Sequence, residues 1–138
     1  MGQENVQVSQ KSLWTLWMTM TCAVFIYGGI GYFVRKLGSA APSPELLPMV
    51  APVFFGMATL ETLALYLFFP RFARKSTYSS YSILRWAFAE SIGVNGLVLF
   101  ILGASPLIFV VFLAWSLLLN LSMMPSDEDR DRFESLRT

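Results

Sequence analysis

Apolar residues fall into four long runs, separated by short polar or proline-rich segments. The runs cover residues 13–34, 49–69, 83–102 and 107–124. A helix needs about 20 mostly apolar residues to cross the hydrocarbon core of a bilayer, and each run is close to that length. No segment alternates between apolar and polar residues in the way that membrane barrel strands do, so each run is expected to be helical. The pattern therefore predicts an all-α fold, an integral membrane four-helix bundle.

The segments between the runs contain residues that end helices. A loop at 38–48 is rich in proline, Pro70 closes the second run and Pro125 closes the fourth. Proline lacks the backbone N–H that a continuing helix requires. The turn at 103–106 is so short that the third and fourth helices are expected to be antiparallel neighbours.

These boundaries divide the chain into an N-terminal segment (1–12), a transmembrane domain (13–124) and a charged tail (125–138). The first run could instead be a cleavable signal peptide, but its 22 residues and the lack of an A-x-A site after it favour a permanent span. The tail mixes both signs of charge and is expected to be a solvated, partly disordered end. The alternative is a helix that docks on a partner.

The basic residues are distributed unevenly between the two predicted sides of the membrane. Four crossings put both termini on one side, together with the loop between the second and third helices. Loops rich in Lys and Arg stay in the cytoplasm, so we expect a multi-pass protein of the inner (cytoplasmic) membrane of bacterial type with both termini cytoplasmic. That side would hold Lys11, Arg71, Arg74, Lys75, Arg85, Arg130, Arg132 and Arg137, and the other side only Arg35 and Lys36.

Composition supports a lipid environment and excludes several classes of partner. Hydrophobic residues make up 55% of the 138 residues and charged residues 14%, and the mean hydropathy is +0.56. The lipid bilayer is thus the expected partner. Ten basic residues against nine acidic ones leave no surplus for nucleic acid. With Cys22 as the sole cysteine and no histidine, neither an internal disulfide nor a His/Cys metal site can form, and no cofactor is expected.

Two carboxylates lie inside the predicted spans and are the candidate site. Of the nine acidic residues, only Glu61 and Glu90 fall within apolar runs. Placing an ionised carboxylate at the centre of a membrane helix costs about 3 kcal/mol of free energy. Such residues therefore usually face the interior of a bundle and usually have a function. Glu61 and Glu90 are therefore predicted to face the interior of the bundle. There they would form either a proton or ion site or hydrogen bonds between helices.

Asn95 is the third member of this candidate site. At about 1.5 Å per residue, Glu61 lies roughly 13 Å from Pro70 and Asn95 roughly 15 Å from Arg85. If the second and third helices are neighbours, Glu61 and Asn95 are at nearly the same depth. A hydrogen bond between them is predicted, because it would ease the burial of both side chains.

Small residues line one face of the third predicted helix. Ala89, Gly93, Gly96 and Gly103 are spaced by four, three and seven residues. Such a stripe lets another helix backbone approach closely, which is a main way in which helices associate in lipid. It is expected to pack this helix within the bundle; the alternative is a contact with another subunit or a second copy of the chain.

The segment Phe88-Ala89-Glu90-Ser91-Ile92-Gly93-Val94-Asn95-Gly96-Leu97-Val98 resembles the carboxylate helix of the proteolipid subunits c and K of rotary ATPases. The segment 60–66 around Glu61 resembles the same pattern less fully. The resemblance implies that Glu90 is the position that would bind and release a proton or sodium ion. The first and fourth runs depart from that family because they are bulky, not rich in Gly and Ala. The Arg-Trp-Ala-x-x-Glu pattern at 85–90 also resembles uncharacterised four-span bacterial membrane proteins.

Two classes of function follow from these residues. The first is a structural or accessory subunit of a membrane complex, in which the carboxylates form hydrogen bonds across helices. The alternative is proton or cation translocation through Glu61 and Glu90. An enzyme is not expected, because no histidine is present to act as a base and no phosphate-binding loop or paired-cysteine motif occurs.

Overall fold

The computed structural model describes residues 10–38 and 45–137, and all regular structure in these ranges is α-helical. The predicted all-α fold class is confirmed for this part of the chain. Residues 1–9 of the predicted N-terminal segment, and Pro42 and Pro44 of the first loop, lie outside the described residues. The helices are α1 (Gln10–Lys36), α2 (Leu47–Leu67), α3 (Phe69–Ala73), α4 (Tyr78–Ile101), α5 (Pro106–Ser122) and α6 (Asp127–Arg137).

The starts of α4 and α5 are fixed by capping side chains. The Thr77 hydroxyl accepts a hydrogen bond from the backbone N–H of Ser80, and the Ser105 hydroxyl accepts one from the N–H of Ile108. These bonds satisfy N–H groups that have no partner inside the helix. Pro106 occupies the first turn of α5, where its missing N–H costs nothing. The cap at Thr77 makes α4 begin five residues before the predicted run at 83–102.

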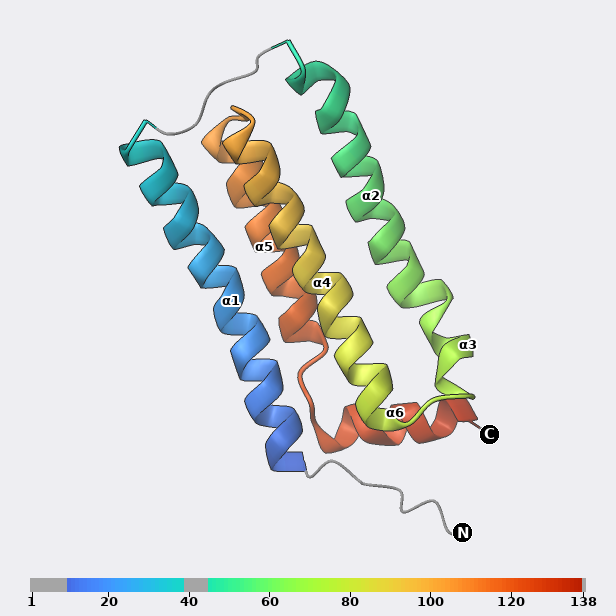
Figure 1. Ribbon diagram of the computed structural model, residues 1–138. Helices are drawn as coiled ribbons and strands as arrows, with labels where there is room; N and C mark the ends of the chain where they lie inside the picture. The colour runs from blue at the N-terminus through green and yellow to red at the C-terminus, as the bar shows by residue number, and fades with distance from the viewer. Residues whose placement is uncertain (1–9, 39–44, 138) are drawn as a thin grey trace, which may run out of the picture.

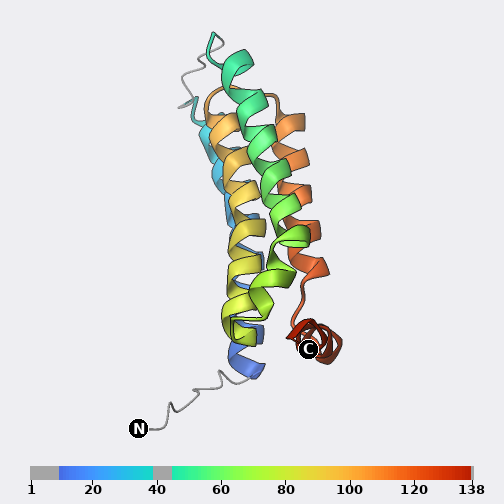
Figure 2. The ribbon, with the colours of Figure 1, turned by 90° about the vertical axis from the view of Figure 1, so that its right-hand side faces the viewer.

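Helices α4 and α5 form the centre of the fold, with α1 and α2 on opposite flanks of α4. Helix α4 packs against α1, α2 and α5. In Figure 1, α4 lies in front of α5, between α1 and α2, and Figure 2 shows the same layering from the side. The predicted antiparallel pairing of the last two long helices agrees with this arrangement. Gly103, in the turn between them, has a φ of 102°, which favours glycine.

The core is concentrated on the inner face of α4. Trp86, Ile92 and Leu99 of α4 are fully buried, as is Phe112 of α5. Phe55 of α2 meets the ring of Phe112 edge to face, with ring centroids 4.7 Å apart. The apolar side chains of α4 thus hold the other three long helices together.

The outer faces of α1, α2 and α5 are covered with large apolar side chains. In α2 only Ala58 and Leu65 are buried, although the helix is apolar along its length. In water such extensive exposure would favour aggregation, whereas in lipid it is the normal state of a helix surface. Examples are Phe25, Tyr32, Phe33, Met49, Leu60, Leu107 and Leu118, all more than half exposed.

Three helices, α1, α2 and α4, are long and apolar enough to cross a membrane. Helix α5 has 17 residues, or about 25 Å of helix, against about 30 Å of hydrocarbon. It counts as a fourth candidate only when joined to α6, which is bent away from it by 80°. The sequence placed the end of this run at 124, whereas α5 ends at Ser122.

The predicted partly disordered tail is wrong for residues 127–137, which form α6. Figure 1 shows α6 lying across the end of the bundle, beside α3 and the start of α4. The Ser126 hydroxyl accepts a hydrogen bond from the N–H of Asp129, and Phe133 is only 1% exposed. The helix therefore docks on its own chain by an apolar contact that composition alone did not reveal.

Candidate functional site

Glu90 of α4 faces α1, where it accepts a hydrogen bond from Tyr27. The Tyr27 hydroxyl donates to Oε1 of Glu90, and both side chains are partly buried. A hydrogen bond to a carboxylate between two helices in an apolar surrounding is a directional tie that also lowers the cost of burying the acid. Glu90 therefore connects α4 to α1.

Glu61 of α2 approaches α4 at Ser91, whose side chain interacts with the Glu61 carboxyl group. The Ser91 hydroxyl also donates to the carbonyl oxygen of Phe88 at 2.7 Å. Oε2 of Glu61 is buried and has no hydrogen-bond partner among the residues that the structure describes. Glu61 thus lies against α4 at Ser91, on the α2 flank.

The predicted hydrogen bond between Glu61 and Asn95 is wrong. Asn95 is 8% exposed, and its amide nitrogen Nδ2, the group of this side chain that could donate to Glu61, has no hydrogen-bond partner within residues 10–38 and 45–137. Ser91 lies one helical turn before Asn95 on the same face of α4, and it is the residue that contacts the Glu61 carboxyl group.

The two carboxylates lie on different flanks of α4 and do not share a site. Glu90 is tied to α1 through Tyr27, whereas Glu61 on α2 interacts with Ser91. Glu90 and Ser91 are consecutive residues, so their side chains leave the helix about 100° apart. The arrangement suits two separate interhelical contacts.

The small-residue stripe of α4 lies against α5. A Cβ atom added at Gly96 would be 2.3 Å from Cβ of Phe112, and one added at Gly93 would be 3.1 Å from Oγ of Ser116. Ala89, on the same face, is fully buried. Gly103 lies beyond the end of α4, in the turn, and so does not extend the stripe.

A second buried polar group, which the sequence analysis missed, connects α1 to α5. The Trp17 indole N–H donates to the carbonyl oxygen of Asn120 at 2.9 Å, and Nδ2 of Asn120 donates to the carbonyl oxygen of Ser116 at 3.2 Å. Asn120 and Ser116 are fully buried. Ser116 and Asn120 are polar residues inside the most apolar predicted run, 107–124. Because polar residues in a membrane span usually face other helices, they could have indicated this contact from the sequence.

A third polar group fastens α6 to the start of α4. Arg85 forms an ion pair with Asp129 at 3.0 Å, and both side chains are nearly buried, at 12% and 10% exposure. The Tyr78 hydroxyl donates to the other Asp129 oxygen at 3.1 Å. The Arg85 guanidinium also lies 4.9 Å from the centre of the Tyr81 ring, within cation–π range.

Tyr27 and Ser91, which the sequence analysis also missed, complete the two carboxylate contacts. Tyrosine in membrane helices gathers at the headgroup level, and Tyr27 lies well inside α1, about 14 Å from the end at Lys36. That unusual depth was the available signal. Ser91 offered no comparable signal, because serine is common on packed helix faces in membranes.

In the ranges that the structure describes, no group of three or more Cys, Asp or Glu side chains is arranged to hold a metal ion. The fold and these contacts define an all-helical protein with apolar helices compatible with membrane insertion, joined by buried polar contacts. No family model, curated protein or solved structure matches the chain. The resemblance to the rotary ATPase proteolipids and to four-span bacterial proteins stays a prediction.

Proposed function

We propose that this chain is a small integral membrane protein that crosses the inner membrane four times and acts as a structural or accessory subunit of a membrane complex, without enzymatic activity. The observation that carries the proposal is the separation of the two membrane carboxylates. Glu90 accepts a hydrogen bond from Tyr27 on one flank of α4, and Glu61 of α2 lies against Ser91 on the other flank. The two acids lie in separate helix contacts, which is what a structural role requires.

The fourth crossing is supported by the shape of the fold. Helix α5 runs antiparallel to α4 over most of its length, as Figure 1 and Figure 2 show, so a membrane that encloses α4 also encloses α5. A helix of 17 residues is at the short end of the range that spans a bilayer. With α5 in the membrane, the bend of 80° between α5 and α6 supports a position of α6 along the membrane surface.

An uncovered face of α4 supports a role within a larger assembly. The face of α4 turned away from α5 lies open between α1 and α2 in Figure 1. Val94 and Val98, one turn apart on α4, are 38% and 36% exposed. This face is free for lipid or for a helix of another subunit.

Proton or cation translocation is the second candidate, favoured by one observation. In the described part of the chain, Oε2 of Glu61 and Nδ2 of Asn95 are both buried without a hydrogen-bond partner. An unpaired carboxylate oxygen in an apolar interface is costly, and a proton or a cation that visits it would relieve that cost.

A carboxyl-directed carbodiimide distinguishes the two candidates, because it labels only a protonated, accessible acid. The wild type is compared with Glu61→Gln and Glu90→Gln in mild detergent across a range of pH. The structural role predicts that sodium and lithium do not reduce the carbodiimide labelling of either glutamate. In liposomes it predicts a decay of an imposed pH gradient no faster than in empty liposomes.

Labelling of one glutamate that falls as pH rises, is blocked by sodium, and disappears in the matching Gln variant would contradict the structural role and establish an exchanging site. Affinity purification from native membranes supplies the complementary measurement. The structural role predicts other membrane proteins in a fixed ratio to this chain, whereas a chain that is recovered only with itself would count against an accessory role.

A further inference from the structure

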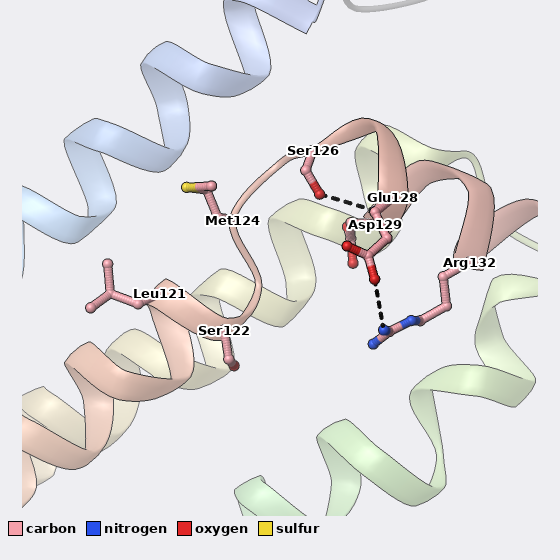
Figure 3. Close-up of a pocket in the computed structure, with 7 residues that line it drawn as sticks. All are labelled: Leu121, Ser122, Met124, Ser126, Glu128, Asp129 and Arg132. Carbon is pink, nitrogen blue, oxygen red and sulfur yellow. Dashed lines mark hydrogen bonds and ion pairs between the residues drawn. The ribbon is translucent and has the colours of Figure 1, made fainter.

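A pocket lies in the elbow where α5 turns into α6. Its volume is 190 Å³. Pockets that enclose whole drug-sized ligands usually measure at least about 300 Å³, so this one suits a small polar group that is part of a larger molecule. Its walls are formed by Leu121, Ser122 and Met124 at the end of α5, and by Ser126, Glu128, Asp129 and Arg132 at the start of α6 (Figure 3).

One wall of the pocket is apolar. Leu121 is 48% exposed and Met124 is 40% exposed. With α5 in the membrane and α6 along its surface, both side chains lie where lipid acyl chains meet the headgroups. A lipid bound in the elbow would therefore place its acyl chains along α5 and its headgroup against α6.

The opposite wall carries one charged side chain of each sign, and the two form an exposed ion pair. Oε1 of Glu128 and the Arg132 guanidinium are 3.7 Å apart, and the two side chains are 87% and 69% exposed. Figure 3 shows this pair at the mouth of the elbow. An exposed pair at this distance is held loosely, so both groups can turn to a ligand. Asp129 cannot, because it is already engaged by Arg85 and Tyr78.

We propose that this elbow binds the headgroup of a zwitterionic aminophospholipid, with the phosphate at Arg132 and the primary ammonium at Glu128. The guanidinium presents several N–H donors to phosphate oxygens, and the carboxylate accepts hydrogen bonds from an ammonium group. A choline headgroup has no N–H to donate, and an anionic glycerol headgroup brings no cation for Glu128. The proposal rests on the proposed function, because it requires α5 in the membrane.

Native mass spectrometry of the full chain in mild detergent tests this site. The protein is titrated with short-chain phosphatidylethanolamine, phosphatidylcholine and phosphatidylglycerol that carry the same acyl chains. We expect phosphatidylethanolamine to bind about tenfold more tightly than the other two, and Glu128→Gln or Arg132→Gln to remove about that factor. Glu128→Lys is expected to shift the preference to phosphatidylglycerol, since the pocket then holds two cations.

Arg130→Gln and Asp131→Asn are the matched controls, because they change the same charges on α6 outside the pocket. Both are expected to bind like the wild type. Equal binding of the three lipids, or equal losses in the control variants, would overturn the proposed site. Failure of membrane insertion is recognised separately, since the chain would then be released from membranes by alkaline carbonate whatever the lipid.

Discussion

Gly96 marks the closest approach of α4 to α5, because a Cβ atom there would lie 2.3 Å from Cβ of Phe112. That atom is next to the backbone and cannot move aside. We expect Gly96→Ala to lower the free energy of unfolding by about 1–3 kcal/mol, the usual cost of overpacking. Thermal or denaturant unfolding in detergent measures this loss.

Gly56 in α2 is the matched control, since a Cβ atom there meets nothing within 4 Å. Gly56→Ala is expected to be neutral or to stabilise the helix by up to about 1 kcal/mol. If both substitutions had the same effect, the close packing of α4 on α5 would be refuted.

The hydrogen bond between Tyr27 and Glu90 is expected to contribute to stability as a pair. A double-mutant cycle with Tyr27→Phe and Glu90→Gln should give a coupling energy of about 0.6 kcal/mol and at most about 1.7 kcal/mol, the average and the maximum for such contacts between membrane helices. Tyr32 is 64% exposed and provides the control. The effects of Tyr32→Phe and Glu90→Gln on stability should be additive. If the coupling energy between Tyr32 and Glu90 were as large as that between Tyr27 and Glu90, the cycle would not be measuring the Tyr27–Glu90 hydrogen bond.

At the residue scale, the sequence identified which groups are costly in a membrane but not what they contact. Glu61 and Glu90 stand out because lipid penalises any carboxylate. Their partners Tyr27 and Ser91 depend on how each helix is rotated about its axis and on the level at which neighbouring helices meet. Hydrophobic runs constrain neither quantity, and for this reason the predicted bond to Asn95 was wrong.

At the element scale, the ion pair between Arg85 and Asp129 is the main polar attachment of α6. Asp129→Asn leaves Arg85, 12% exposed, without its carboxylate, and breaking a buried pair in this way costs about 3 kcal/mol or more. We expect α6 to detach more often, so hydrogen exchange and protease cleavage within 127–137 should accelerate while α4 and α5 remain protected.

Asp131→Asn changes the same charge on an exposed position of α6 and is expected to leave exchange unchanged. An Asp129→Asn variant whose α6 exchanges like the wild type would show that the apolar contact of Phe133 alone holds the helix. In that case Phe133→Ala, and not Asp129→Asn, should release it.

The long helices could be predicted as elements, whereas α6 could not. Each long helix is an apolar run that only a helix can carry through lipid. Helix α6 has only Phe133 and Leu136 as apolar points, and its stability comes from a docking surface that includes Tyr78, Tyr81 and Arg85. That surface exists only after the bundle has assembled, so local composition favoured a solvated end.

At the scale of the whole molecule, the short turn at 103–106 predicted correctly that α4 and α5 are antiparallel neighbours. The central position of α4 was not predicted, because four apolar runs of similar length can be arranged in several ways. The small residues Ala89, Gly93 and Gly96 indicated a close contact but not its partner. The structure places α5 against them.

The number of membrane crossings is the claim on which the proposed function depends, and cysteine accessibility tests it most directly. In a Cys22→Ala background, single cysteines replace Leu37, Lys75, Ser105 or Arg130, exposed positions in the segments that follow or precede the long helices, with Arg130 in α6. A membrane-impermeant maleimide is then applied to right-side-out and inverted vesicles. Four crossings predict that the cysteines at 75 and 130 react from one side and those at 37 and 105 from the other. Reaction of the cysteines at 105 and 130 from the same side would show that α5 does not cross, and would contradict the four-span account.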